Sequence, residues 1–565
     1  MRRVLLLLSF AWVAGACAHG SGAAAPAGVG GAGVQNDAGT PVRDAGVGQR
    51  DAGSSAFDGG RLTDPGLGDL PDPDAALDAA ATKRLDFRNG DPRVPVKLME
   101  GAKEVTFIPR GRVRMKLSGS VEKSVDAPAN SVWRVRITSS TPAEIVARVQ
   151  LAEFPFADKD GLAQEQKSWE DKGLKVRAHI LGGIYGIAGK VIDNRRYLLL
   201  IDEALSPEKA QALQAEIVRK YGVRTSLFEE TKTPSSGVLE LLDENGGVVA
   251  VAQDRIRTEV EGEAGFEVKK VEYGVGYDFH GFEDRSYRGQ LTLLIDRKGA
   301  IAVVNVVSLE DLLRGLVPSE IYAKAHVEAL KAQAVTARGE VLAKIGTKHL
   351  ADPYLLCSEQ HCAVYKGRSG EVASANAAVS ATRGEALFSK DGRLVDSVYS
   401  AVCGGHTENN DVVWGGPPNP SLRGVPDFIG PEKNLPSPKN LEAFLSTELP
   451  SACRLSTFAQ PNKYRWEKRF TADEVNAFTS KLGIGKVMAM AVTDRGVSGR
   501  ARLLTISGEE GATQIRGELN IRRLFGMLNS AMFLVTPEKK DGKLVGWLFR
   551  GGGWGHGVGM CQTGA

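Results

Sequence analysis

The pattern of apolar positions is most regular between Ser308 and Gly346, where it predicts two helices. Ser308 is suited to cap a first helix, whose apolar face carries Leu309, Leu312, Leu313 and Leu316. Pro318 disfavours helical geometry at the residue before it, so this helix is expected to end there. A second helix is expected from about His326 to Gly346, because apolar residues recur at spacings of three and four.

Glu320 lies between these two predicted helices. A carboxylate at a kink between packed helices can be held in one rotamer, which is the placement that a general acid requires. The alternative is a glutamate near a helix start that satisfies free backbone amides. The local pattern alone favours this alternative.

Alternating or continuous apolar runs predict short strands over much of the chain. Expected strands are 94–100, 105–109, 112–117, 133–138, 175–180, 197–201, 238–243, 248–252, 268–273, 291–296 and 300–307. Helices are expected at 142–149 and 207–221, which gives a βαββαβ-like order between residues 130 and 230. The near-continuous apolar run at 300–307 predicts a buried strand that leads directly into the helix after Ser308.

These elements predict a multidomain α+β fold of mixed β-sheets with packed helices and a central cleft. The expected divisions are a lipoprotein-type signal at 1–17, a disordered tether at 18–90, a short strand-rich segment at 91–129, an α/β domain at 130–230 and a larger domain at 237–565.

The N-terminus has the form of an export signal. Arg2 and Arg3 precede an apolar run at residues 4–13 that is too short to span a bilayer, and small residues then lead to Cys17. This resembles a bacterial lipoprotein signal, in which the cysteine is lipidated; ordinary cleavage that leaves a free thiol is the alternative. Ala18 rather than aspartate follows the cysteine, so in a double-membrane bacterium we expect a cell-envelope protein anchored in the outer membrane and facing the periplasm.

The amino-acid composition indicates a disordered tether near the N-terminus and argues against nucleic acid as a partner. From residue 18 to about residue 81 the chain consists mainly of Gly, Ala, Asp and Pro, which cannot bury enough apolar surface to offset chain entropy. The whole chain has 71 basic and 68 acidic residues, a net charge of +3. This balance lacks the signature of a nucleic-acid-binding protein.

A series of ordered motifs resembles the SpoIID/LytB family of cell-wall proteins over residues 237–565. The motifs are Tyr287-Arg288-Gly289, Val304-Asn305, Leu309–Leu313, Gly315–Glu320, Glu328–Val335, Cys357–Tyr365, Ala381–Gly384, Gly404–Asn409, Trp414-Gly415 and Gly553–Met560. The family usually continues through a further helix, which leaves open a domain that is truncated at its C-terminus. Residues 130–230 resemble the peptidoglycan-binding SPOR repeat in element order; a plain scaffold domain is the alternative.

The resemblance implies a lytic transglycosylase that cleaves denuded, peptide-free glycan strands of peptidoglycan, with Glu320 as general acid and then base. One carboxyl group is enough for this reaction, because the 6-hydroxyl of N-acetylmuramic acid attacks its own anomeric carbon and leaves a 1,6-anhydro end. To hold its proton near neutral pH, Glu320 must be buried among apolar neighbours. The alternatives are a noncatalytic enhancer of an amidase, as LytB is described, and a structural lipoprotein.

Six further side chains are expected to line the substrate site: Lys331, Arg338, Tyr399, His406, Trp554 and His556. The two basic residues either orient substrate carboxylates or are solvated helix charges. The aromatic pair can stack on sugar rings or belong to a core. Both histidines are preceded or followed by glycine, which allows a ligand to approach the backbone closely, and they are preferred over His179, His280 and His349.

Cys357, His361 and Cys362 form a candidate zinc site, since two thiolates and an imidazole in one short loop suit tetrahedral zinc. The resemblance also implies a metal near the active site. A fourth ligand from elsewhere or an open position is then required, and a disulfide between the two cysteines is the alternative in an exported protein. The pairing of Cys403, Cys453 and Cys561 is left open by the sequence.

Overall fold

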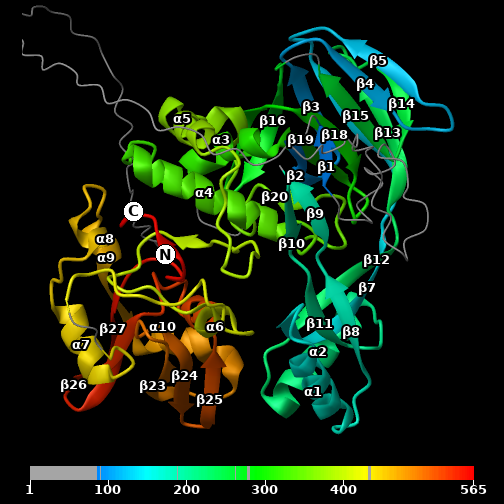
Figure 1. Ribbon diagram of the computed structural model, residues 1–565. Helices are drawn as coiled ribbons and strands as arrows, with labels where there is room; N and C mark the ends of the chain where they lie inside the picture. The colour runs from blue at the N-terminus through cyan, green and yellow to red at the C-terminus, as the bar shows by residue number, and fades with distance from the viewer. Residues whose placement is uncertain (1–84, 89–90, 188, 261–262, 276–279, 431–433) are drawn as a thin grey trace, which may run out of the picture. The chain divides into compact units, whose positions relative to one another are not determined.

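The computed structural model describes residues 85–565 apart from 89–90, 188, 261–262, 276–279 and 431–433 (Figure 1). Cys17, the expected signal and most of the expected tether lie outside the described residues, so lipidation stays a prediction. No helix in the described part is long and apolar enough to cross a membrane. The described chain is a mixed α+β structure, as predicted.

Two large sheets enclose the main hydrophobic core. The first has the order β1-β2-β19-β18-β15-β4-β5, and β20 pairs in parallel with β2. Its strands are β1 (Asp86–Arg88), β2 (Asp91–Ala102), β4 (Val113–Leu117), β5 (Lys123–Ala127), β15 (Arg255–Val260), β18 (Gln290–Ile295), β19 (Ile301–Ser308) and β20 (Leu356–Cys357).

The second sheet has the order β14-β13-β6-β3-β16-β17. Its strands are β3 (Glu104–Pro109), β6 (Trp133–Thr141), β13 (Ser236–Leu242), β14 (Val248–Gln253), β16 (Phe266–Tyr273) and β17 (Gly281–Tyr287). Both sheets therefore combine strands from before residue 142 with strands from beyond residue 235. The segment 91–129 is part of these sheets and not a unit of its own.

A smaller unit with its own core is inserted between β6 and β13. It has the order β7 (Glu144–Pro155), α1 (Lys159–Glu170), β8 (Val176–Leu181), the hairpin β9 (Ile184–Ile187) and β10 (Lys190–Asp193), β11 (Arg196–Ile201), α2 (Pro207–Tyr221) and β12 (Ser226–Thr233). Its main sheet is antiparallel, in the order β12-β7-β11-β8. The unit follows a βαββαβ order only if the β9–β10 hairpin is left aside, and its first strand and first helix are not the predicted ones.

The boundaries of this unit differ from the expected ones. The predicted helix at 142–149 is wrong, because the residues from 144 to 151 bury every second side chain, Ala147, Val149 and Leu151 among them, and form the strand β7. The predicted strand at 133–138 belongs to the six-stranded sheet, so the unit begins at Glu144 and not at 130. Helix α2 has the predicted bounds.

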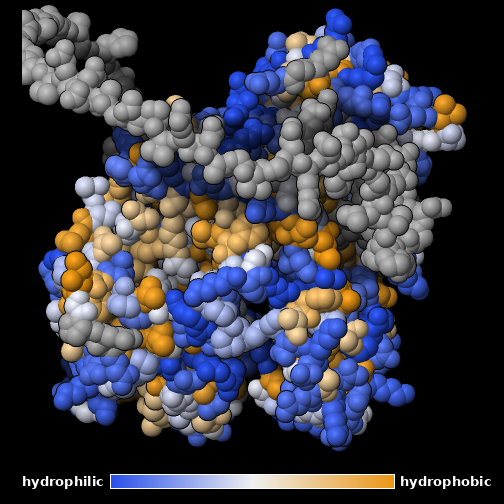
Figure 2. All heavy atoms as spheres, viewed as in Figure 1, coloured by the Kyte–Doolittle hydropathy of each residue, from blue (hydrophilic) through white to orange (hydrophobic). Residues whose placement is uncertain are grey.

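Three helices, α3 (Leu309–Glu320), α4 (Val327–Lys344) and α5 (Ala373–Ala381), pack together on the main core, and α3 follows the buried strand β19 directly (Figure 1). The Ser308 hydroxyl caps α3 by accepting a hydrogen bond from the Asp311 amide at 3.2 Å. Figure 2 shows apolar residues gathered over α4 in this view.

The predicted end of the first helix before Pro318 is wrong, because α3 continues to Glu320. A proline in the last turn removes only one helical hydrogen bond, and the helix still closes through a bond from the Ile321 amide to the Val317 carbonyl at 3.1 Å. Glu320 is therefore the last residue of α3. The reading of Glu320 as a residue near a helix start is wrong.

The C-terminal part contains two three-stranded sheets around a second core. They are β22 (Arg465–Thr471), β27 (Lys543–Gly552) and β26 (Phe533–Lys540), and β23 (Val487–Arg495), β24 (Ala501–Gly508) and β25 (Gly511–Arg516). The helices here are α6 (Asn410–Trp414), α7 (Pro438–Ser446), α8 (Ala452–Leu455), α9 (Pro461–Tyr464), α10 (Ala472–Thr479) and α11 (Glu518–Leu524). Parallel pairing of β21 (Tyr399–Ser400) with β28 (Met560–Cys561) joins the two ends of this part.

Candidate active site

Glu320 is held at the C-terminal end of α3 with its side chain partly exposed. Burial raises the pKa of this carboxyl to about 7, and the nearby charge of Glu340 adds to the effect. The Val364 amide, which donates a hydrogen bond to Oε1 at 2.8 Å, and Lys344 oppose it. A helix C-terminus also favours a neutral carboxyl over a charged one. Glu320 therefore holds its proton near neutral pH and can still be reached from solvent.

A second carboxyl lies beside Glu320. Glu340, on α4, forms an ion pair with Lys344, with 2.7 Å between Oε1 and Nζ, and burial raises the pKa of Glu340. The phenol of Tyr399 lies next to both carboxyls; its burial and their charges raise its pKa, so that it remains a hydrogen-bond donor. Tyr399 was expected at the substrate site, whereas Glu340 was not.

His556 is the next group in this cluster. Burial lowers the pKa of its imidazole to about 3, and the charges of Arg500 and Arg522 act in the same direction. The ring is therefore neutral, and Nδ1 accepts a hydrogen bond from the Val558 amide at 3.1 Å. The proton of the neutral ring then sits on Nε2, and the ring donates a hydrogen bond to the Tyr399 backbone. The expectation that His556 lines the site agrees with this placement.

Three aromatic side chains near these groups remain exposed, which suits the stacking of sugar rings. Tyr322, Trp414 and Trp554 are 39%, 40% and 39% exposed. The Tyr322 ring stacks on Phe458 and the Trp414 ring lies 5.0 Å from that of His556. Trp554 was expected here. Tyr322 and Trp414 were not, although Trp414 belongs to one of the motifs.

Gln562 connects the C-terminal segment to the acid. Its side-chain amide donates hydrogen bonds to the Glu320 carbonyl at 2.9 Å and to Gln333 Oε1 at 3.1 Å. The sequence contained no signal for this contact, because it joins residues that are 242 positions apart.

Three expected binding residues lie elsewhere. Arg338 is buried, and its guanidinium forms a bidentate pair with Glu310 and donates to the Glu385 carbonyl, so it is not available to substrate. Lys331 pairs with Glu328 on the exposed side of α4, as a solvated helix charge does. His406 is 2% exposed, with Nδ1 at 2.7 Å from the Thr407 carbonyl; the glycines before it serve backbone packing and do not expose its ring.

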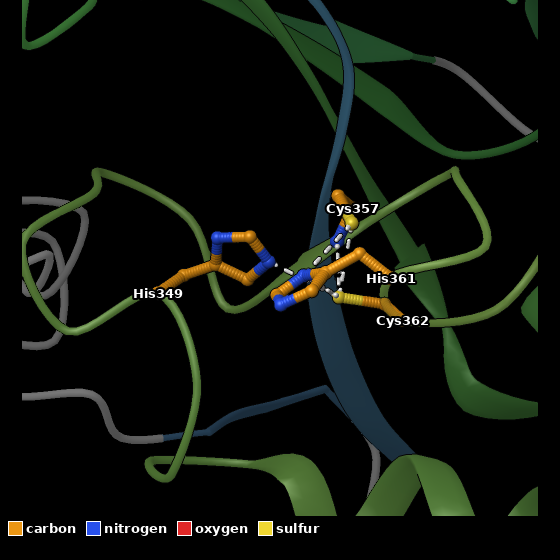
Figure 3. Close-up of side chains that lie close together, drawn as sticks. All are labelled: His349, Cys357, His361 and Cys362. Atoms are coloured by element: carbon orange, nitrogen blue, oxygen red, sulfur yellow. Dashed lines mark hydrogen bonds between the residues drawn. The ribbon is translucent and has the colours of Figure 1, made fainter. Parts of the chain in front are cut away.

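The expected metal cluster is present and has a fourth member. Cys357, His361 and Cys362 are joined by His349, and one ligand atom of each lies within 4.8 Å of all the others (Figure 3). The Cys362 sulfur lies 3.0 Å from the Cys357 sulfur and 3.1 Å from His349 Nε2. The hydrogen bond between the sulfurs lowers the pKa of Cys357 and raises that of Cys362, so one thiolate is formed readily.

This donor set fits tetrahedral zinc with two sulfur and two nitrogen ligands. His361 Nδ1 lies 3.8 and 3.7 Å from the two sulfurs. The second ring nitrogen of His349 lies 2.9 Å from Asp352, the carboxylate partner that orients metal-ligating histidines. The sequence treated His349 as an isolated histidine, because eight residues separate it from Cys357 and no motif joins them.

The cluster of His349, Cys357, His361 and Cys362 is linked to Glu320 through two nearby residues. Val364, whose amide contacts Glu320, follows Cys362 by two residues, and Lys344 donates a hydrogen bond to the Cys362 carbonyl. Order in the loop that carries the cysteines therefore determines the position of one of the groups that bind the Glu320 carboxyl.

The other cysteines converge in a second place. Cys403, Cys453 and Cys561 are buried together, and all five cysteines of the described part are free thiols. None of the disulfide pairings that the sequence left open is present in the described structure.

Comparison with known proteins identifies the class of the central domain. Residues 297–388, which include Glu320 and the cluster of His349, Cys357, His361 and Cys362, match the family described as stage II sporulation protein (SpoIID). Residues 408–559 match a domain of unknown function, DUF8618.

Similar proteins agree with that class. An uncharacterized protein of Brachyspira hyodysenteriae is 27% identical over 292 residues, 51% of this chain and 68% of that protein. A Bacillus subtilis protein named amidase enhancer is 27% identical over 45% of this chain and 37% of its own length. Another Bacillus subtilis protein, named stage II sporulation protein D, is 26% identical over 46% of this chain and 68% of its own length. These matches support the assignment of residues 297–388 to the SpoIID/LytB family.

Proposed function

We propose that this protein remodels peptidoglycan in the cell envelope, as a lytic transglycosylase that cleaves peptide-free glycan strands. The observation that carries the proposal is the pKa of about 7 of a partly exposed carboxyl, that of Glu320, within the SpoIID domain. A general acid is most effective when its pKa lies near the working pH. Anchoring through Cys17 in the outer membrane, facing the periplasm, is part of this proposal.

In this reaction protonated Glu320 gives its proton to the glycosidic oxygen as the bond to the anomeric carbon breaks. The resulting carboxylate then accepts the proton of the muramic acid 6-hydroxyl, whose oxygen bonds to the same carbon. The acid is regenerated and no water is consumed. The Tyr399 hydroxyl supplies a hydrogen-bond donor for a sugar oxygen, His556 positions Tyr399 through a hydrogen bond to its backbone, and the exposed aromatic rings supply stacking surfaces.

The cluster of His349, Cys357, His361 and Cys362 would hold a zinc ion. When bound, zinc would supply structural cross-linking of the loop, since its binding energy adds directly to folding. The loop in turn would fix the Val364 amide against Glu320 Oε1. This hydrogen bond would hold the carboxyl group, and the proton that it carries, in one orientation.

The proposal is tested by digesting peptide-free glycan strands in ¹⁸O-labelled water and analysing the products by mass spectrometry. We expect ends in 1,6-anhydro-N-acetylmuramic acid with no ¹⁸O, because the nucleophile is the sugar's own hydroxyl. Strands that still carry stem peptides should resist. Reducing ends labelled with ¹⁸O would show hydrolysis by water and contradict the transglycosylase mechanism.

A second candidate function is favoured by one observation, the relative that is named amidase enhancer. In that case the protein would bind glycan strands and stimulate an amidase without cleaving glycan itself. Adding the Glu320→Gln variant to a peptidoglycan amidase distinguishes the two functions. An enhancer would stimulate the amidase as strongly with glutamine at this position as with glutamate, and the unmutated protein would cleave no glycan.

A further inference from the structure

Four ligand-type side chains from separate segments converge in the C-terminal part. They are Cys403 after β21, Asp427 in the loop after α6, Cys453 in α8 and Cys561 in β28, and one ligand atom of each lies within 4.8 Å of all the others. The Cys403 sulfur lies 3.6 Å from that of Cys453 and 3.2 Å from Asp427 Oδ2. The three cysteines are 0%, 1% and 9% exposed.

We propose that Cys403, Cys453, Cys561 and Asp427 bind a second, structural zinc ion, independent of the cluster around Cys357. Four protein ligands that close the coordination shell are typical of structural zinc sites. Zinc–sulfur bonds of ~2.3 Å and tetrahedral geometry place neighbouring sulfurs ~3.8 Å apart. The separation of 3.6 Å between Cys403 and Cys453 is close to this value.

Backbone amides are already directed at the ligand atoms. The Cys403 amide donates to the Cys561 sulfur at 3.2 Å, the Gly405 amide to the Cys403 sulfur at 3.4 Å, and the Cys453 amide to Asp427 Oδ2 at 3.2 Å. The turn that directs the Gly405 amide needs φ values of 75° at Gly404 and 100° at Gly405, which glycine adopts without strain. Such donors stabilise negative charge on thiolates and a carboxylate.

Charge balance also favours a cation here. Three thiolates and one carboxylate carry four negative charges, of which a divalent ion neutralises two. The guanidinium of Arg465 lies beside the cluster, where it donates to the Gly404 carbonyl at 2.9 Å, and supplies a further positive charge. Buried charges are tolerated when they are paired or coordinate a metal.

A disulfide is the competing use of these thiols in an exported protein. A disulfide requires sulfurs ~2.0 Å apart, would use two of the three cysteines and would leave the third thiol next to the half-buried carboxylate of Asp427. The described sulfurs are free and share a single centre with Asp427. This arrangement matches a metal site with four ligands better than one disulfide and two unused groups.

The proposed ion would join segments that lie far apart in the sequence: the Gly-Gly-His turn, the residues around Asp427, helix α8 with Cys453, and the C-terminal segment. Gln562, next to Cys561, donates to the Glu320 carbonyl. The zinc site would therefore hold the C-terminal segment in place beside the acid. The existence of this site does not depend on whether the protein cleaves glycan.

The test counts zinc in the full chain, purified under reducing conditions, loaded with Zn²⁺ and desalted, by native mass spectrometry. We expect two zinc ions per chain in the unmutated protein, one in Cys453→Ser, one in the matched variant Cys357→Ser and none in the double variant. Ser451→Ala removes a buried hydroxyl 3.8 Å from the Cys453 sulfur and should retain both ions. With Co²⁺ in place of Zn²⁺, Cys357→Ser should show charge-transfer absorption from three thiolates and Cys453→Ser from two.

The decisive quantity is the difference between Cys453→Ser and the unmutated protein. A loss of one zinc per chain supports the site, whatever the other cluster holds. An unchanged zinc content overturns it, and so does peptide mapping that finds Cys453 in a disulfide in metal-loaded protein. If Cys453→Ser fails to fold, Asp427→Asn replaces it, and this variant should release one zinc at a lower chelator concentration than the unmutated protein. Equal release would overturn the proposal.

Discussion

Opposing influences act on the Glu320 carboxyl, and burial dominates. Burial and the charge of Glu340 raise its pKa, while the Val364 amide and Lys344 lower it, with a net value of about 7. The sequence identified Glu320 through the motif at its helix end and predicted that it must be buried. It named Tyr399 for the substrate site but could not supply Val364 or Glu340, because these neighbours come from two other segments and meet Glu320 only in the folded chain.

The first prediction concerns pH dependence. Because the protonated form of Glu320 is the active one, kcat/KM should be highest below pH 7 and fall as the pH rises through about 7. Glu340→Gln removes a neighbouring negative charge and should move this alkaline limb to lower pH, whereas the exposed variant Glu328→Gln should leave it in place. A pH–rate profile on peptide-free strands measures both. If kcat/KM falls at the same pH in Glu340→Gln as in the unmutated protein, the charge of Glu340 does not raise the pKa of Glu320.

The second prediction concerns stability. The folded-state pKa of about 7 lies above the usual 4.5, so the folded state binds more protons between these values, and stability falls as the pH rises through this range. Glutamine avoids this loss. Glu320→Gln should therefore increase the free energy of unfolding at pH 8 by up to roughly 3 kcal/mol and change it little at pH 4.

Urea unfolding at the two pH values measures this difference, with Glu328→Gln as the control. A Glu320→Gln variant that is less stable than the unmutated protein at pH 8 would show that the charged carboxylate is well accommodated. The pKa of Glu320 would then not be raised.

Helices and strands were predictable where the apolar period was unambiguous, as in α2, α4 and β19. The run at 142–149 was misread because a short apolar stretch fits both periods, and its pairing partner, β12, lies more than seventy residues away. The end of α3 was misplaced because a proline in the last turn costs little when only one bond is lost. His349 was missed because metal ligands need to be close only in space.

The third prediction tests the role of His349 in the loop between α4 and α5. His349→Ala should abolish zinc binding at the cluster with Cys357 and Cys362 and lower Tm, because a four-ligand site loses one ligand. Asp352→Asn, which alters the partner of His349 and also the ion pair with Arg297, should weaken zinc binding about 10–100-fold.

Metal analysis and thermal unfolding after chelator titration measure both effects. His280→Ala, at an exposed histidine paired with Glu272, is the control and should keep its zinc. Zinc retained in full by His349→Ala would mean that the fourth ligand is another group.

The arrangement of sheets was the part of the fold least accessible from the sequence. Strands before residue 142 pair with strands after 235, and no pattern of residues indicates that an intact unit separates them. In the structure the chain enters and leaves the inserted unit at the same place. Glu144 pairs with Thr233 at the two ends of the unit, and Thr141 pairs with Ser236 in the six-stranded sheet. Termini that lie this close together are typical of inserted domains.

The fourth prediction follows from this geometry. Replacing residues 142–235 by Asn-Gly should join β6 and β13 through a two-residue hairpin turn and leave the remaining protein folded. The hydrogen bonds from Tyr185 to the Leu342 carbonyl and from Asn194 to the Ile345 carbonyl are lost, each worth about 1 kcal/mol. The main core also loses the buried side chain of Ile192 in β10, so the shortened protein should be less stable than the full chain.

Cleavage of glycan should therefore persist in the shortened protein, and the isolated unit of residues 143–234 should fold cooperatively. If this unit is SPOR-like, it should also bind peptide-free strands. Loss of cooperative unfolding in the shortened protein would show that the unit is required for the stability of the main core.

The most direct test of the account is the rate at which Glu320→Gln cleaves peptide-free glycan strands, measured beside the unmutated protein and Glu328→Gln. Glutamine keeps the size of the side chain and can still accept the hydrogen bond from the Val364 amide, but it cannot donate a proton to the leaving oxygen. We predict a loss of about 100- to 10,000-fold in rate with strand binding nearly unchanged, while Glu328→Gln cleaves normally. Cleavage by Glu320→Gln at the unmutated rate would contradict the assignment of Glu320 as the acid.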